Sequence, residues 1–197
     1  AMVLLRNENA TLPLKGNEKV ALYGITSIDF VAGGTGSGNV NKAYVVNMKE
    51  GLENAGFSVD KALVEYYQKT IELQAAQRAL AGNGGRGMGM GSSKLAEIEI
   101  PQTAITAESA TNDLAVIVIG RNAGEGADRH MMDDFELTSV ERELIQNVST
   151  TYHAAGKKVV VVLNIGGVIE TNSWKYLVDA ILLPWSPGQE GANAIGD

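Results

Sequence analysis

The composition of the chain excludes several classes of protein at the outset. The chain has 197 residues, 45% hydrophobic with no cysteine, so it can bury one full-sized core without disulfides and has no thiol nucleophile or thiolate metal ligand. Its 23 acidic residues outnumber its 16 basic ones, the net charge is −7, and no stripe of Lys or Arg is present, which disfavours a nucleic-acid partner. No stretch approaches the roughly 20 apolar residues that span a bilayer, so no membrane partner is expected.

The length predicts a single domain over residues 1–197. The sequence starts at Ala1-Met2 and stops at Asp197 inside the start of a helix, and we interpret it as a piece of a longer protein. Residues 1–20 show no basic segment followed by an apolar run, but in an excised piece this says little about location. The compartment is therefore not fixed, with the cytoplasm favoured as the default.

The first half of the chain predicts the opening of a βαβ unit. A short apolar strand over Lys19–Tyr23 runs into Gly24 and then into a long loop, 25–41, which contains GGTGSGNVN. Apolar residues at helical spacing predict a helix over Tyr44–Ala55, which Gly56 ends.

A second helix is predicted from about Asp60 to Ala81, in a segment rich in Ala, Leu, Gln, Glu and Lys. The following residues, 82–93, are almost all Gly, Met and Ser, and this composition predicts a flexible loop.

The second half alternates strands and helices. Continuous apolar runs predict buried parallel strands over Leu114–Ile119, Lys158–Asn164 and Asp179–Leu183. A capping box at Thr138 and Glu141 opens a helix that runs to about Ala155, and a short helical segment follows at Trp174–Val178. The chain is therefore predicted to form an α/β fold, a three-layer αβα sandwich with a mostly parallel sheet of five or six strands. The loops after Tyr23, Gly120, Asn164 and Leu183 are expected at one edge of that sheet.

The loop after Leu114–Ile119 carries the first candidate functional residue. Glu125 lies between Gly124 and Gly126, and glycines on both sides allow a carboxylate to be presented at close range. Ligands of open α/β sheets bind beyond the carboxyl ends of the strands, which is where this loop is expected. From the local pattern alone, a solvated loop acid is the favoured interpretation.

The glycine loop does not match the known phosphate-binding patterns. A P-loop needs Lys and then Ser or Thr after its last glycine, whereas Gly38 is followed by Asn39 and Val40. The dinucleotide pattern also fails, because the third glycine and the later acidic residue are missing. Glycines interleaved with Thr35, Ser37 and Asn39 suit the close approach of a hydroxylated ligand instead.

No metal and no cofactor are expected. His130 and His153 have no matching ligand spacing, which disfavours a zinc site. No G-x-S-x-G elbow is present, so a Ser-His-Asp hydrolase has no nucleophile here. The loop after the strand predicted at Leu114–Ile119 contains five acids that follow no calcium-loop pattern. We interpret them as solvated: Glu125, Asp128, Asp133, Asp134 and Glu136.

Five ordered motifs resemble a known family. They are VLLRNEN followed by TLPL at 3–14, GGTGSG at 33–38, VIGRNAGEGADR at 118–129, VVVVLNIGGVIE at 159–170 and WSPGQEG at 185–191. Together they resemble the C-terminal α/β-sandwich domain of glycoside hydrolase family 3, in its β-glucosidase branch. The resemblance covers nearly the whole chain, and only 82–105 has no firm counterpart.

The resemblance implies an active site shared with a (β/α)-barrel domain that this chain lacks. The barrel would supply an aspartate nucleophile, and the substrate would be a β-linked glucoside or a related glycan. On the family pattern the acid/base falls at Glu125, with Asp128 and Glu136 as lesser candidates. The glycine loop would contact sugar hydroxyls through Gly34, Thr35, Gly36 and Ser37, Ser37 first among them. The order of the two domains is not implied.

Two functions are therefore open. In the first, the chain is part of a retaining glycosidase and is inactive when isolated. In the second, it is a non-catalytic carbohydrate-binding or structural domain. A barrel in the same protein would distinguish the first from the second.

Overall fold

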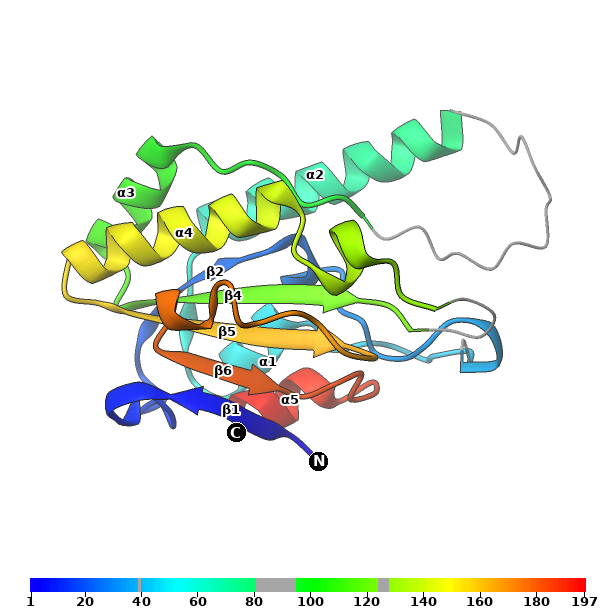
Figure 1. Cartoon of the computed structure of the whole chain (residues 1–197), viewed down its shortest axis with the longest axis horizontal. Coiled ribbons are helices and arrows are strands. Elements are labelled where there is room, and N and C mark those ends of the chain that lie inside the picture. The colour runs from blue at the N-terminus through cyan, green and yellow to red at the C-terminus, as the bar shows by residue number, and fades with distance from the viewer. Residues whose placement is uncertain (39, 81–94, 124–127) are drawn as a thin grey trace.

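The computed structural model describes residues 1–38, 40–80, 95–123 and 128–197 (Figure 1). The described residues contain a six-stranded sheet in the order β1-β6-β5-β4-β2-β3. The strands are β1 (Val3–Asn7), β2 (Lys19–Tyr23), β3 (Ser58–Val59), β4 (Leu114–Arg121), β5 (Lys158–Ile165) and β6 (Ala180–Leu183). All neighbouring strands pair in parallel except β1, which runs antiparallel to β6 at the edge.

Helices cover both faces of the sheet, as Figure 1 shows. They are α1 (Met48–Asn54), α2 (Lys61–Leu80), α3 (Gln102–Thr111), α4 (Ser139–Ala154) and α5 (Gly191–Gly196). The helices α2, α3 and α4 pack on one face, and α1 and α5 pack on the other. The predicted α/β sandwich with a mostly parallel sheet is therefore confirmed.

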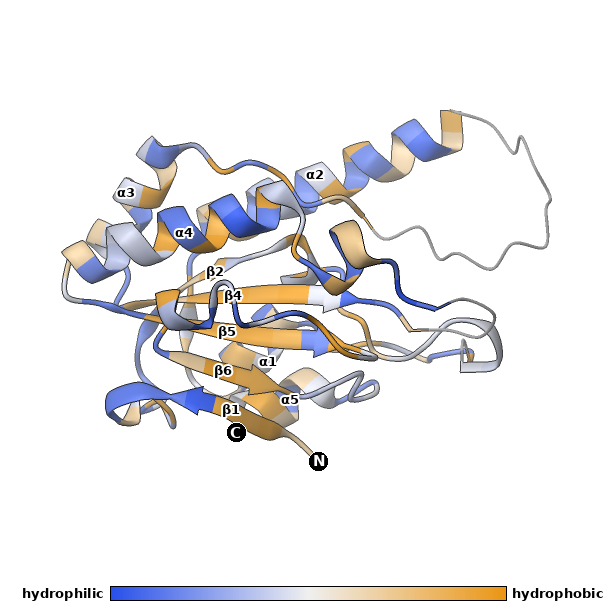
Figure 2. Cartoon of the chain, in the orientation of Figure 1, coloured by the Kyte–Doolittle hydropathy of each residue, from blue (hydrophilic) through white to orange (hydrophobic). Residues whose placement is uncertain are grey.

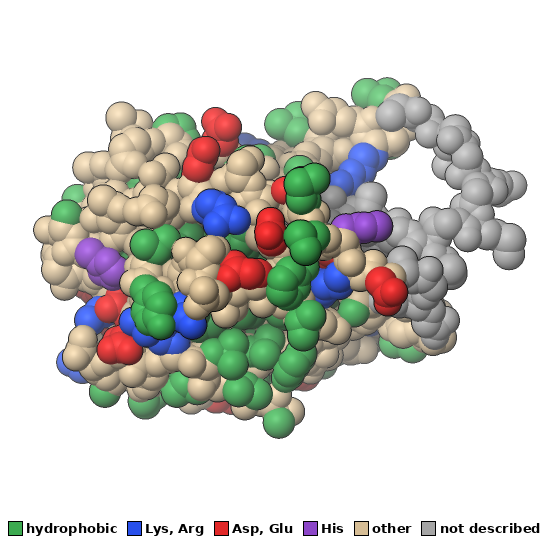
Figure 3. Space-filling model, in the orientation of Figure 1, with side chains coloured by type: hydrophobic (Ala, Val, Ile, Leu, Met, Phe, Trp, Pro, Cys, Tyr) green, Lys and Arg blue, Asp and Glu red, His purple; other side chains and the backbone are tan. Residues whose placement is uncertain are grey.

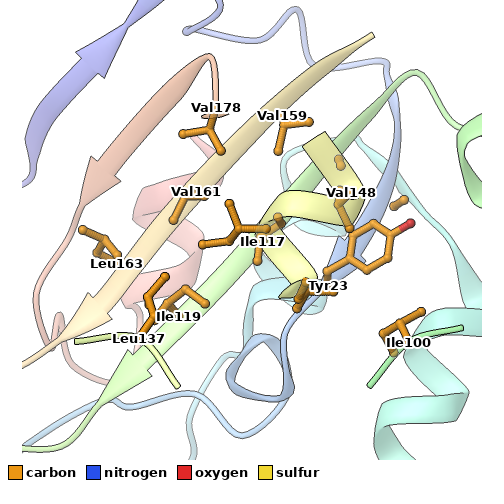
Figure 4. Packing of buried hydrophobic residues seen from close by; sticks show 14 of the residues in the cluster. Tyr23, Ile100, Ile117, Ile119, Leu137, Val148, Val159, Val161, Leu163 and Val178 are labelled. Carbon is orange, nitrogen blue, oxygen red and sulfur yellow. The ribbon is translucent and has the colours of Figure 1, made fainter. Parts of the chain in front are cut away.

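Strand periodicity divides the core into two layers. Side chains alternate between the faces of a strand, so Ile117 and Ile119 join one cluster while Val116 and Val118 join the other. Figure 4 shows the first cluster, in which Ile117 lies near Val148 of α4. Figure 2 shows the central strands hydrophobic along most of their length and the helices mixed. This two-sided burial explains why the strands read as unbroken apolar runs.

The predicted element bounds hold for the strands and need correction for two helical segments. The first helix begins at Met48 and not at Tyr44, because Asn47 caps it: its side chain accepts the Glu50 N–H at 3.0 Å. The backbone just before that cap is held elsewhere, since the Val46 N–H donates to the Gln189 carbonyl at 2.9 Å. The segment predicted at Trp174–Val178 is a 3₁₀ turn over Lys175–Leu177.

Other expectations are confirmed or fall outside the structure. The capping box at Thr138 and Glu141 is present at the start of α4. The predicted flexible loop at 82–93 lies outside the described residues. None of the described helices is long and apolar enough to cross a membrane. On the face shown in Figure 3, Lys and Arg side chains are scattered among acidic ones and form no stripe.

The sheet order places a topological switch point between β2 and β4. From β2 the chain passes through α1 to β3 at one edge, whereas β4 lies on the other side of β2. The connections that follow β2 and β4 therefore diverge at the carboxyl end of the sheet. Such a divergence is where open α/β sheets bind ligands.

Candidate functional site

The connection after β2 starts at Gly24, whose backbone conformation and close packing only glycine allows. Gly24 has φ of +94°, and a Cβ there would lie 2.2 Å from the Val118 carbonyl oxygen of β4. Its N–H donates to the Tyr67 hydroxyl at 2.9 Å, and the next N–H, of Ile25, donates to the Glu97 carboxylate at 2.8 Å. Burial raises the pKa of Tyr67 well above its ordinary value, so the hydroxyl stays protonated. The glycine loop therefore starts from a fixed point.

The glycine loop, residues 33–41, lies against the start of the loop that follows β4. We call this second loop, residues 122–137, the acidic loop. The Thr35 N–H donates to the Ala123 carbonyl at 2.9 Å, and a Cβ on Gly34 would lie 2.8 Å from that same oxygen. Gly36 and Ser37 belong to an exposed 3₁₀ turn over Gly36–Gly38. The structure thus brings two of the predicted ligand-contacting residues directly onto the second loop and leaves the other two at the surface.

The predicted acid/base, Glu125, lies outside the described residues, and the flanks of its loop are described on both sides. Asp128 is exposed, and Glu136 is partly buried with its N–H bonded to the Met131 carbonyl at 2.9 Å. Asp134 forms an ion pair with Arg129. Of the five acids in this loop, Asp134 is therefore engaged with a cation.

Arg121, the last residue of β4, closes the base of the acidic loop. It is buried, and its Nη1 and Nη2 atoms each lie 2.6 Å from an oxygen of the equally buried Glu141 carboxylate. Its Nε donates to the Asp134 carbonyl at 2.9 Å and its Nη2 to the Glu136 carbonyl at 3.3 Å. A bidentate pair of this kind is the geometry in which guanidinium and carboxylate match best.

Asn164, near the end of β5, connects two further loops. It is fully buried, and its Oδ1 accepts the Val31 N–H at 2.7 Å. Its Nδ2 donates to the carbonyls of Val31 and Trp185, both at 2.9 Å. One amide therefore joins the segment that leads into the glycine loop to the loop that follows β6.

A cavity of about 220 Å³ opens where the two loops meet. Asp29, Gly34, Thr35, Lys42 and Asn122 contribute to its wall. The wall thus offers a carboxylate, an ammonium, an amide and a hydroxyl, which are groups that hydrogen-bond a polyhydroxylated ligand. A larger cavity of about 560 Å³ lies elsewhere, between β1, the 12–16 segment and the end of α5, and none of the candidate residues lines it.

The two histidines stand apart in the structure. His153 lies in α4 with its Nε2 2.8 Å from the Asp179 carboxylate, and His130 lies at the acidic loop. Among the described residues, no three His, Asp or Glu side chains gather in a group that could hold a metal ion.

The sequence interpretation did not identify Arg121 or Asn164 as structural anchors. Each is a polar residue at the end of an otherwise apolar strand, and each is buried. A buried polar side chain must find partners, so a polar residue directly after an apolar run was the available signal. Nothing in the sequence pattern around Lys42 and Asn122 indicated that they would line the cavity.

Comparisons with known proteins identify the family to which the chain is similar. A model of the glycosyl hydrolase family 3 C-terminal domain matches residues 2–197. Beta-glucosidase A of Butyrivibrio fibrisolvens is 29% identical over 220 residues, covering 98% of this chain and 25% of that protein.

Solved structures give the same result. Beta-glucosidase 3B from Thermotoga neapolitana, in complex with glucose, matches with a TM-score of 0.87 and 41% identity over 100% of this chain and 27% of that chain. A beta-glucosidase from Paenibacillus barengoltzii matches with a TM-score of 0.83 and 30% identity, over 100% of this chain and 21% of that one. The chain therefore spans about a quarter of the length of these relatives.

Proposed function

The chain belongs to the glycosyl hydrolase family 3 C-terminal domain family, and from this premise we propose that it is the sandwich domain of a retaining β-glucosidase. In this proposal residues 1–197 form one domain, and a barrel domain of the same protein completes the active site. The substrate is a β-linked glucoside or a related glycan. The chain alone is then inactive, because it holds only part of the catalytic machinery.

The observation that carries the proposal is the contact between the two loops at the switch point. The bond from the Thr35 N–H to the Ala123 carbonyl fixes the glycine loop beside the loop that contains Glu125. A sugar bound against Gly34, Thr35, Gly36 and Ser37 would therefore lie next to that acidic loop. The relative from Thermotoga neapolitana, solved in complex with glucose, supports a hexose as the ligand.

The chemistry assigns complementary roles to two carboxyl groups. Retaining hydrolysis uses two of them about 5–5.5 Å apart, one as nucleophile and one as acid and then base. We assign the acid/base to Glu125 and the nucleophile to an aspartate of the barrel. Glu125 must be protonated at rest, and burial under the barrel or the negative charge of the nucleophile would raise its pKa accordingly.

A leaving-group series tests the assignment in the protein that contains this chain and the barrel. Glu125→Gln should lower hydrolysis of substrates with poor leaving groups by roughly 10²–10⁴-fold, and hydrolysis of activated aryl glucosides much less, because only the former need a proton at departure. Azide should restore turnover of the activated substrate and yield the β-glucosyl azide, since azide needs no general base. Glu65→Gln, an exposed change on α2, serves as the matched control and should change neither.

The alternatives predict different results. If Asp128→Asn or Glu136→Gln shows the leaving-group effect and the azide rescue in place of Glu125→Gln, the acid/base role moves to that residue. If none of the three does, and the protein still binds glucose, the chain is a non-catalytic carbohydrate-binding domain.

A further inference from the structure

Arg121 lies in the 118–129 motif, four residues before Glu125, and has a role that the motif alone does not suggest. We propose that Arg121 is a positioning residue, which with Glu141 fixes the two described arms of the acidic loop, 122–123 and 134–136, in register with the glycine loop. The inference rests on the proposed function, because its consequence is measured in glycoside hydrolysis. It concerns residues that are neither substrate ligands nor reacting groups.

The guanidinium of Arg121 uses every donor it has. A guanidinium carries five N–H donors in a fixed fork. In Arg121 the Nε donates to the Asp134 carbonyl, Nη1 to the Gly120 carbonyl and to Glu141, and Nη2 to the Glu136 carbonyl and to Glu141. The five distances lie between 2.6 and 3.3 Å. No donor is left for a ligand, so Arg121 acts through the backbone that it holds.

These bonds tie the departing and returning arms of one loop together. The chain leaves the sheet at Arg121, and the carbonyls of Asp134 and Glu136 come back to the guanidinium of that residue. On the departing arm, the Ala123 carbonyl accepts the Thr35 N–H of the glycine loop. Arg121 therefore sets where the acidic loop starts, where it ends and how it meets the glycine loop.

Glu141 extends the same connection into α4. Its carboxylate accepts the Thr138 N–H at 2.9 Å as half of the capping box, while both oxygens bind Arg121. One carboxylate thus joins the start of the helix to the end of the strand. The end of the strand, the two arms of the loop and the start of the helix are therefore one hydrogen-bonded unit.

Stability alone does not account for a pair of this kind. Both side chains are 2% exposed, and the cost of removing two charges from water often cancels their attraction, so apolar replacements of such pairs can be as stable. What apolar side chains cannot do is hold three backbone carbonyls in fixed directions. Lysine cannot do so either, because its single ammonium lacks the planar fork.

The experiment compares Arg121→Lys with Glu125→Gln in the protein that carries the barrel. Arg121→Lys keeps the charge and loses the fork, so the acidic loop should shift relative to the sugar. We expect kcat/KM for a poor leaving group such as an alkyl glucoside to fall about 10–10²-fold, and that for a dinitrophenyl glucoside less than threefold, because only the proton donation is misaligned. Azide should accelerate turnover of the dinitrophenyl substrate by the variant.

Two further variants keep the result interpretable. Ile105→Ala removes a fully buried side chain on α3, far from the loops, and any loss it causes should be equal for both substrates. Glu141→Gln leaves Arg121 in place and should show the same selective loss to a smaller extent. If Arg121→Lys does not fold, Glu141→Gln decides the question by itself.

Each outcome has a single meaning. A leaving-group effect in Glu125→Gln and in Arg121→Lys supports both proposals. The effect in Glu125→Gln with a uniform loss in Arg121→Lys overturns the positioning role and leaves the proposed function intact. Its absence from Glu125→Gln overturns the assignment of the acid/base, whatever Arg121→Lys does.

Discussion

The amide of Asn164 is expected to be among the most costly side chains to remove from this fold. It is 0% exposed, and it makes three hydrogen bonds to the backbone of two loops that follow different strands. In Asn164→Ala, the Val31 N–H and C=O and the Trp185 C=O all lose their partner. The loss therefore falls on the loops that these three groups belong to.

The magnitude follows from the burial of those three groups. A buried polar group without a partner costs about 1–3 kcal/mol. Val31 is only partly buried and Trp185 is 40% exposed, so water can reach part of the gap and the sum of three full penalties is too large. We expect a loss of about 2–4 kcal/mol in the free energy of unfolding. For a chain of this size that corresponds to a fall in Tm of about 5–15 °C.

Urea denaturation at constant pH measures the loss, and hydrogen exchange locates it. The Val31 amide should exchange faster in Asn164→Ala, because its acceptor is gone. Asn147→Ala, on the exposed side of α4, is the control and should change stability by less than about 0.5 kcal/mol. A loss below about 1 kcal/mol in Asn164→Ala, or unchanged exchange at Val31, would refute the argument that this amide holds the two loops.

Two further predictions concern Gly24 and Glu108. Gly24→Ala should cost about 3 kcal/mol or more, because the Cβ meets the Val118 carbonyl at 2.2 Å, while Gly156→Ala, with φ of +69° and open space, should cost about 1 kcal/mol in the same urea assay; equal losses would contradict the close approach. Burial, with the negative charge of Asp60 second, raises the pKa of Glu108 from 4.5 to about 7, so the folded state favours the protonated acid. The contribution of Glu108 to the stability of the folded state is complete below pH 4.5 and is lost as pH rises through about 7. Since Glu108 is partly solvated, we expect the loss to be about 1 kcal/mol between pH 5 and pH 8, and Glu108→Gln to abolish it in a pH series of urea melts; an unchanged slope would rule out Glu108 as its source.

The central strands were predictable because each is buried on both faces. Residues 114–119 and 159–163 are apolar throughout, and no other element of this length fits such a run between turn signals. The elements that were missed have no such pattern. Strand β1 is mostly exposed and is defined by its antiparallel pairing with β6, and α3 buries only Ile105 and Ser109. Those elements form because the rest of the fold offers them a partner, which local sequence does not encode.

The candidate site was likewise only partly predictable from the sequence. That the glycine loop and the acidic loop share one edge could be predicted from strand direction, and the contact of Gly34 and Thr35 with Ala123 agrees with it. The start of α1 was misplaced because Val45 follows helical spacing while the neighbouring Val46 is bonded to Gln189. The long-range bonds of the buried polar residues could not be predicted, since their partners lie on other elements.

The two buried anchors lie on opposite faces of the sheet, and strand periodicity explains why. In the parallel register Gly120 pairs with Asn164 and Arg121 with Ile165, so the two polar residues differ by one position. Side chains alternate along a strand, and one position therefore reverses the face. Arg121 points to the α4 layer and holds the acidic loop, while Asn164 points to the other layer and holds the segment that leads into the glycine loop.

Each of the two loops of the candidate site thus has its own anchor, separate from the contact between the loops. The acidic loop is fixed from the α4 face by Arg121 and Glu141, and the glycine loop is fixed from the opposite face by Asn164. Among the described residues they are joined over the open edge of the sheet, where the Thr35 N–H donates to the Ala123 carbonyl. A site assembled in this way has each wall held by a buried polar side chain on its own face of the sheet. It requires a polar residue near the end of each of two apolar strands, Arg121 on β4 and Asn164 on β5.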